Sequence, residues 1–220
     1  MIAQDLTNNM IPTLQLADSI DRAIALLEEQ YVEQLPVVEK GEYLGMIHES
    51  DLFNNQHSQK NIANIQLRNQ KVFLTPNTHF LQILKEASQY KLRLFPIVEK
   101  QKYLGVVDMS DLTLAMGHSM ALQIAGGIFT LSVNYIDYSM SEISRIIESN
   151  NAKVLSSFIE EDDNNTDKLK VTIKVNVKDL TAIIATFERF SYKVLAKFHE
   201  TETQSNESQR LDMLFRYLEM

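Results

Sequence analysis

The sequence contains no cysteine among its 220 residues. This absence excludes disulfide bonds, thiolate nucleophiles and cysteine-based zinc or iron–sulfur centres. Glycine is scarce as well, with six residues, and none of them lies in a glycine-rich phosphate-binding loop. The 21 basic residues are outnumbered by 29 acidic ones, and no local basic patch offsets the net charge of −8. We therefore expect no direct binding of nucleic acid.

Long hydrophobic runs are also missing. The longest apolar-leaning stretch, Ala121 to Val133, is shorter than a membrane span and is interrupted by Gln123 and the pair Gly126-Gly127. The N-terminus lacks the basic region, apolar core and cleavage site of a signal peptide. We expect a cytoplasmic chain with no membrane partner.

Patterns that support catalysis or metal binding are absent too. None of the five histidines lies in an HxxxH or HxH spacing, and no serine lies in a GxSxG turn. The acidic run from Glu160 to Asp163 lacks the spaced ligands and turn glycine of a calcium loop. The sequence therefore predicts neither an enzyme nor a metal site.

An internal repeat with a period of 60 residues is the strongest feature that the sequence does contain. The matching segments are LPVVEK (35–40) with FPIVEK (95–100), YLG (43–45) with YLG (103–105), and SDL (50–52) with SDL (110–112). Three matches in one register, without a gap, indicate a duplicated structural unit.

Each copy begins with an amphipathic helix. Apolar residues recur at helical spacing after residue 19 in the first copy and after residue 79 in the second. Asp18 or Ser19 is placed to cap the first of these helices, and Thr78 to cap the second.

A hairpin and a final helix follow in each copy. A proline-led apolar run, a polar turn and a second apolar run predict two antiparallel strands. Ser50 and Ser110 are placed to cap helices that begin at Asp51 and Asp111. With a short strand at its start, each repeat is predicted to be βαββα.

This order of elements, with its hydrophobic-Pro-Val-Val run and its Asp-Leu helix start, resembles the CBS domain, a module that occurs in tandem pairs. The resemblance covers a pair in residues 1–120, with repeats of about 1–60 and 61–120. It implies a non-catalytic regulatory protein that binds AMP, ADP, ATP or S-adenosylmethionine in a cleft between the repeats.

The resemblance also implies site residues. In CBS pairs the aspartate at the start of the last helix holds the ribose hydroxyls, a role that falls here on Asp51 and Asp111. A carboxylate is suited to this role because it accepts two hydrogen bonds from a vicinal diol. The alternative is that each aspartate only favours its helix N-terminus.

The family often has Ser or Thr three residues earlier, where it donates to a phosphate, but this chain has His48 and Asp108. Protonated His48 can donate, whereas Asp108 repels an anion. Arg93 lies where related proteins place a phosphate-binding basic residue, and its counterpart in the first repeat is Glu33. We therefore expect at most one phosphate-competent site.

The pattern changes after residue 126. Alternating strands at 129–135, 154–158, 171–177 and 192–198 are separated by two amphipathic helices and by an acidic turn from Glu160 to Asp167. The order is βαββαβ, a ferredoxin-like arrangement, so the whole chain is predicted to be α+β.

Placed after a CBS pair, residues 126–200 resemble an ACT domain, and the chain resembles bacterial CBS-plus-ACT proteins of the acetoin-utilisation-B type. ACT domains that bind amino acids usually have Pro-Gly before the first helix, whereas Tyr138-Ser139 stands here. The tail at 201–220 ends in an amphipathic pattern, which indicates a short helix docked on its own domain or, alternatively, a partner-binding peptide.

The leading functional hypothesis is a ligand sensor, and the alternative is a scaffold whose clefts bind no nucleotide. CBS helices and ACT-like sheets both favour self-association, so we expect a homodimer. A sensor without an output domain must signal through that dimer or through an unidentified protein partner.

Overall fold

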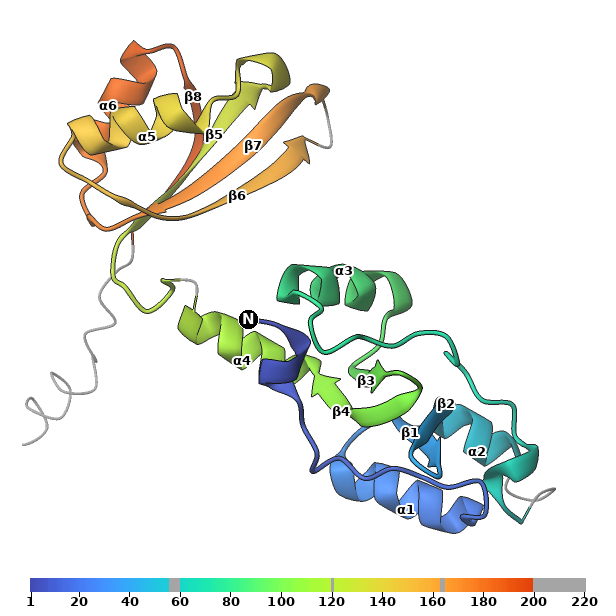
Figure 1. Cartoon of the computed structure of the whole chain (residues 1–220). Helices are drawn as coiled ribbons and strands as arrows, with labels where there is room; N and C mark the ends of the chain where they lie inside the picture. The colour runs from blue at the N-terminus through green and yellow to red at the C-terminus, as the bar shows by residue number, and fades with distance from the viewer. Residues whose placement is uncertain (56–59, 120, 163–164, 200–220) are drawn as a thin grey trace, which may run out of the picture. The chain divides into compact units, whose positions relative to one another are not determined.

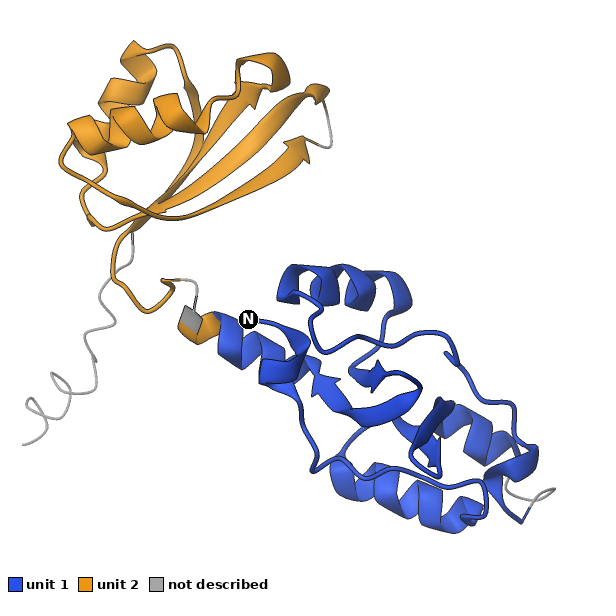
Figure 2. Cartoon of the chain, viewed as in Figure 1, with its two compact units in different colours: residues 1–116 blue, residues 117–220 orange. Residues whose placement is uncertain are grey.

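The computed structural model describes residues 1–55, 60–119, 121–162 and 165–199. The chain forms two compact units, residues 1–116 and 117–220 (Figure 2). Each unit contains one four-stranded antiparallel sheet with helices packed against it. The predicted α+β class is therefore confirmed.

The first unit is built from two hairpins that share one sheet. Its strands are β1 (Gln34–Glu39), β2 (Glu42–His48), β3 (Leu94–Glu99) and β4 (Lys102–Asp108). Their order in the sheet is β1-β2-β4-β3, and the two hairpins meet where Glu42 pairs with Lys102 (Figure 1). The 60-residue repeat in the sequence is thus a repeat of hairpins around a central seam.

Two helices accompany each hairpin. They are α1 (Ile20–Gln30) and α2 (Glu49–Asn55) in the first repeat, and α3 (Phe80–Tyr90) and α4 (Met109–Ser119) in the second. As predicted, Ser19 caps α1 by accepting from the Arg22 amide.

The predicted cap of α3 is wrong. The Thr78 hydroxyl bonds instead with Thr75, whose amide and hydroxyl both lie 3.0 Å away, and so closes the preceding turn. His79 is left as the N-cap, and its Nδ1 accepts from the Leu81 amide at 3.4 Å.

The N-terminal segments of the two repeats are exchanged. The chain start, with the 3₁₀ turn Ala3–Leu6, bonds to the second repeat through Ala3 N and Thr78 O at 2.8 Å, and Ala3 is buried in that repeat's core. The equivalent 3₁₀ turn Ile62–Asn64 packs on the core of the first repeat through Ile62. The core of each repeat is therefore completed by residues from the other repeat.

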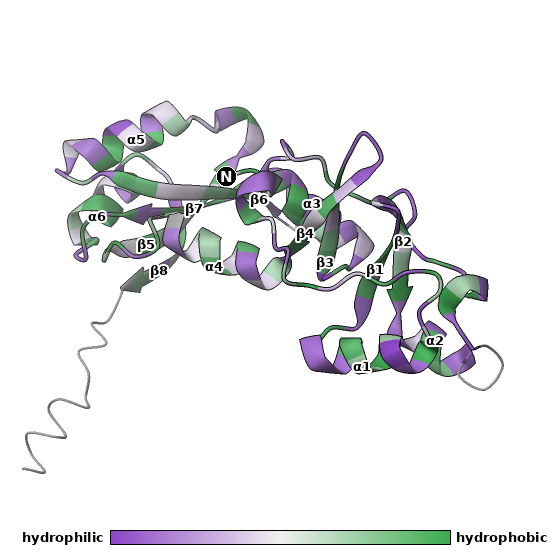
Figure 3. Cartoon of the chain, turned by 60° about the horizontal axis from the view of Figure 1, so that its bottom comes forward, coloured by the Kyte–Doolittle hydropathy of each residue, from purple (hydrophilic) through white to green (hydrophobic). Residues whose placement is uncertain are grey.

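The first strand of each predicted βαββα unit is reduced to a single parallel bridge. Leu14 pairs with Val37, and Leu74 pairs with Ile97. Both leucines are buried, so the bridges anchor the segment that precedes each helix to the sheet. In Figure 3, β1 and β2 are mostly hydrophobic, whereas α1 has separate hydrophobic and hydrophilic residues along its length.

The second unit has the predicted βαββαβ order. Its elements are β5 (Gly127–Asn134), a 3₁₀ turn (Tyr135–Asp137), α5 (Met140–Ser149), β6 (Val154–Asp162), β7 (Asn165–Val175), α6 (Thr181–Arg189) and β8 (Lys193–His199). The sheet order β6-β7-β5-β8 is that of a ferredoxin-like fold. Both helices cover the same face of the sheet (Figure 1).

The core of the second unit lies between that face and the two helices. Phe129 and Phe187 meet there with ring centroids 5.4 Å apart, and both are fully buried. The predicted acidic turn is narrower than expected, because Glu160 pairs with Lys170 inside the β6–β7 ladder. The tail at 201–220 lies outside the described residues.

Candidate functional site

The helices that end the two repeats begin two residues earlier than predicted. Ser50 and Ser110 therefore lie inside the first turn and do not cap it. The capping atoms come from the preceding residues: His48 Nδ1 accepts from the Ser50 amide at 3.1 Å, and Asp108 Oδ1 from the Ser110 amide at 2.7 Å. The positions where the family often has Ser or Thr are thus helix caps in both repeats.

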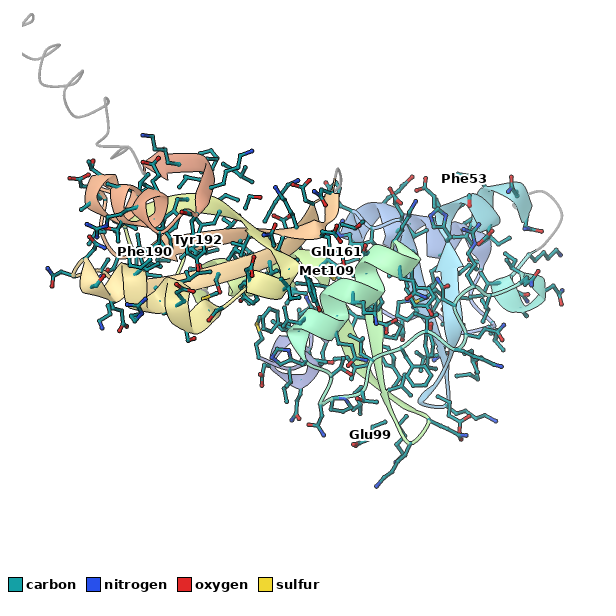
Figure 4. All side chains as sticks on the ribbon, turned by 90° about the horizontal axis from the view of Figure 1, so that it is seen from above. Phe53, Glu99, Met109, Glu161, Phe190 and Tyr192 are labelled. Carbon is teal, nitrogen blue, oxygen red and sulfur yellow. The ribbon has the colours of Figure 1, made fainter. Side chains whose placement is uncertain are left out.

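These caps lie at the ends of the hairpins away from their turns. Figure 4 labels Glu99, beside the β3–β4 turn, and Met109, the first residue of α4 at the other end of β4. Asp51 and Asp111 follow the caps as third residues of their helices. Both therefore lie at helix N-termini, where backbone amides favour negative charge.

Asp51 is held by an arginine of the second repeat. Arg68 Nη2 donates to Asp51 Oδ1 at 2.6 Å and to Ser50 Oγ at 3.0 Å. The other carboxylate oxygen, Oδ2, is buried without a hydrogen-bond partner in the part of the chain that the structure describes. An unpaired buried acceptor is costly to the folded state.

His48 extends this network. Its Nδ1 lies 3.0 Å from Ser50 Oγ and also accepts from the Ser50 amide. A neutral His48 therefore carries its proton on Nε2, which lies 3.8 Å from Glu33 Oε2. In its neutral form, His48 can therefore donate from Nε2 to a ligand.

Asp111 has the equivalent place in the second repeat, but a different partner. Asn8 Nδ2 donates to Asp111 Oδ2 at 3.0 Å. Asn8 precedes Arg68 by 60 residues, so the exchanged N-terminal segments supply the partner of the aspartate in both repeats. We call the surface around Asp51, Arg68 and His48 the first cleft, and the surface around Asp111, Asn8 and Asp108 the second cleft.

Arg93 bridges the two repeats. It donates from Nη2 to Asp108 Oδ2 at 3.2 Å and from Nη1 to the Tyr31 carbonyl at 2.7 Å. Burial alone would raise the pKa of Asp108, but hydrogen bonds from the Ser110 hydroxyl and amide, together with Arg93, outweigh it and lower the pKa below its usual value. Asp108 is therefore an ionised carboxylate that caps α4 and pairs with Arg93.

A cavity of about 460 Å³ opens beside the first cleft, between the repeats. Its lining consists of residues 31–34, His48, Arg68, Asn69 and residues 90–94. The structure thus brings His48 and Arg93 together around one space, with Asp51 behind Arg68, and places Asp111 apart from them. Sequence reasoning missed Arg68, because the equivalent position in the first repeat is the unlike residue Asn8.

The second unit has a hollow of about 410 Å³ between the end of β5 and the start of β8. Phe190 and Tyr192, labelled in Figure 4, contribute to it together with Glu142. Burial, followed by the charge of Glu142 and a hydrogen bond to it, raises the pKa of the Tyr192 hydroxyl. That bond ties the start of β8 to α5.

No helix within the described ranges is long and apolar enough to cross a membrane. No group of three or more metal-binding side chains occurs among those same residues.

Two hairpin-and-helix repeats that exchange their N-terminal segments around a pair of clefts define a duplicated α+β module. The CBS domain family model matches this module at residues 3–58 and 62–118, together just over half of the chain. The chain therefore belongs to the CBS domain family, and it contains a tandem CBS pair.

Known proteins are similar to part of the chain. The CBS domain-containing protein YhcV of Bacillus subtilis is 24% identical over 132 residues, which are 58% of this chain and 91% of YhcV. A CBS domain pair/ACT domain protein of Thermotoga maritima is similar in structure at 15% identity and a TM-score of 0.49, over 55% of this chain and 100% of that one.

Two further solved structures have a similar fold. A putative acetoin utilization protein (AcuB) of Vibrio cholerae is 19% identical, with a TM-score of 0.48, over 56% of this chain and 97% of that one. The CBS domain pair of protein MJ0100, solved with 5′-methylthioadenosine and S-adenosyl-L-methionine, is 22% identical, with a TM-score of 0.46, over 53% of this chain and 96% of that one.

Proposed function

We propose that the chain is a cytoplasmic, non-catalytic regulator whose CBS pair binds an adenosine-containing ligand, such as AMP, ADP, ATP or S-adenosylmethionine. Its second unit is proposed to be an ACT-like domain. CBS domain proteins are generally regulatory, and the MJ0100 pair was solved with two adenosine compounds. The observation that carries the proposal is the cavity of about 460 Å³ between the repeats, lined by His48, Arg68 and Arg93.

The chemistry of this cavity suits a nucleoside. Tyr31 and Tyr90 contribute aromatic surface to its lining, which suits a purine. The Asp51 carboxylate is proposed to accept from a ribose hydroxyl after a shift of Arg68, because Arg68 covers Asp51 and the unpaired carboxylate oxygen is buried in the described part of the chain. His48 Nε2 and the charge of Arg93 favour a phosphate on the same ligand.

A scaffold with empty clefts is the second candidate. One observation favours it: Arg68 already bonds Asp51, and Asn8 already bonds Asp111. In this alternative both aspartates serve only to join the exchanged segments to the repeats.

A thermal-shift screen separates the two candidates. AMP, ADP, ATP, adenosine and S-adenosylmethionine are added at millimolar concentration, because a ligand that binds only the folded chain raises its Tm by mass action. Asp51→Ala and Asp111→Ala are screened beside Glu29→Ala, which removes an exposed acid of α1.

At least one compound is expected to raise the Tm of the wild-type chain and of Glu29→Ala, and one of the two aspartate variants is expected to lose the shift. If no compound shifts the wild type, or if the shift survives both aspartate substitutions, the adenosine proposal is wrong and the scaffold takes its place.

We also propose that the chain is a homodimer. The support is a hollow of about 370 Å³ on α1 and α2, where Tyr31 and Phe53 are exposed beside Ile24 and Leu27. Exposed apolar surface of this kind is typical of contact surfaces. Light scattering at tens of micromolar is expected to give the mass of a dimer, with Phe53→Ser weakening it, and a strict monomer would contradict the proposal.

A further inference from the structure

The two clefts have the same backbone frame. The Arg68 amide donates to the Met46 carbonyl at 2.8 Å, and the Met46 amide donates to the Arg68 carbonyl at 2.8 Å. Asn8 makes the same pair of backbone bonds with Val106, at 2.7 and 3.2 Å. Gly45 and Gly105 follow this symmetry, since a Cβ on either would lie within 3 Å of the exchanged segment. Any difference between the clefts therefore comes from side chains.

Those side chains differ in charge. The first cleft has Arg68 beside its aspartate and His48 as the helix cap, whereas the second cleft has Asn8 and the buried, ionised Asp108 in the same places. Arg93 compensates little in the second cleft, because its charge is paired with Asp108 and it also donates to the Tyr31 carbonyl. An anion beside Asp51 meets the charge of Arg68, with Glu33 on the far side of His48 as the opposing charge, whereas an anion beside Asp111 meets the charge of Asp108. The first cleft is therefore the more favourable of the two for an anion.

Arg68 also has capacity for a ligand. Within the described part of the chain its hydrogen bonds are made by Nη2, which leaves Nη1 and Nε. Its side chain is 48% exposed, and the residue lines the cavity. A guanidinium has five donors in a planar fork that fits a phosphate. One arginine can therefore keep Asp51 in place and bind an anion at once.

We propose that Arg68 makes the first cleft selective for a phosphorylated adenosine ligand, while Asn8 and Asp108 leave the second cleft unable to hold a phosphate. This inference rests on the proposed function and adds to it the ligand class and the residue that selects it. It predicts one nucleotide per chain and a preference for AMP over adenosine that depends on residue 68.

Isothermal titration calorimetry with AMP and adenosine tests the inference on the full chain. The wild type is expected to bind one AMP per chain, about tenfold or more tighter than adenosine, as a charge-assisted contact implies. Arg68→Asn installs the residue found at position 8 and is expected to abolish the preference while adenosine affinity changes by less than about threefold. Arg22→Asn, on the exposed side of α1, is the matched control and should keep the preference.

The outcomes are distinguishable. If AMP and adenosine bind the wild type equally, if two AMP bind per chain, or if Arg68→Asn keeps the preference, the inference is wrong and the proposed function stands. If neither compound binds, the proposed function is wrong and the inference falls with it. Should Arg68→Asn fail to fold, the salt dependence of wild-type binding decides, since only the AMP affinity is expected to fall between 50 and about 500 mM salt.

Discussion

The two CBS repeats have nearly the same backbone and quite different clefts. Their hairpins have the same register, including the same bulge, and their helices begin at equivalent positions. In the clefts, however, the positions of Glu33, His48 and Arg68 are taken in the other repeat by Arg93, Asp108 and Asn8. The duplicated frame therefore fixes where functional side chains stand, and the residue types decide what each cleft can hold.

The cores show the opposite behaviour. Buried positions change in size, as from Leu35 to Phe95 and from Met46 to Val106, but they remain apolar and fully buried. Volume is redistributed inside each repeat, while polarity is kept.

The largest expected effect comes from truncating the core. Phe95→Ala is expected to destabilise the first unit by about 3–5 kcal/mol, because the side chain is fully buried and leaves a cavity. Leu35→Ala, at the matching position, should cost about 2–5 kcal/mol and less than Phe95→Ala. Urea unfolding followed by circular dichroism measures both, and a cost below about 1 kcal/mol for Phe95→Ala would show that the cores are not close-packed.

The next effect distinguishes the two helix caps. Asp108→Ala is expected to destabilise the chain by about 1–2 kcal/mol, because α4 loses its cap and Arg93 loses its partner, and His48→Ala by less. The same measurement at equal ionic strength gives both values. Equal losses for the two variants would contradict the difference described between the caps.

The Asp108 contribution also depends on pH. Its pKa is lower in the folded chain than in the unfolded one, so ionised Asp108 stabilises the fold above the unfolded pKa of about 3.9. The contribution is lost as the pH falls through the lowered folded pKa. The Tm difference between wild type and Asp108→Asn should therefore be present at pH 7 and shrink below pH 4, and a difference that grows in acid would overturn this account.

The smallest effect compares two equivalent tyrosines. Tyr43 donates to the Asn69 carbonyl at 3.0 Å, whereas the Tyr103 hydroxyl is buried without a partner among the described residues. Tyr43→Phe should cost about 0.5–1.5 kcal/mol, and Tyr103→Phe should be neutral or stabilising. Thermal unfolding that shows equal losses would contradict the difference in hydrogen bonding.

The sequence allowed most of the fold to be predicted, because hairpins and amphipathic helices are local patterns and the 60-residue repeat doubled each signal. The caps were predicted less well. Thr78 looks like a cap, but it bonds Thr75, and the Ser residues at 50 and 110 yield to His48 and Asp108. The cap is whichever of several neighbouring polar side chains accepts from the free backbone amide in the first turn of the helix, and the sequence does not specify which one does.

The site was predicted only in part. His48, Asp51, Asp111 and Arg93 were singled out from the family resemblance, but Arg68 was not. Arg68 reaches Asp51 because the segment before the second repeat crosses to the first repeat. Such an exchange between repeats is a tertiary feature, and no local pattern around Arg68 signals it.

The most direct test of the central claim is a crystal structure of the full chain with AMP at saturating concentration. The account predicts one AMP per chain in the first cleft, with its phosphate within hydrogen-bond distance of Arg68 and its ribose on Asp51. A phosphate on the Asn8 and Asp111 side, or no nucleotide in either cleft, would contradict it.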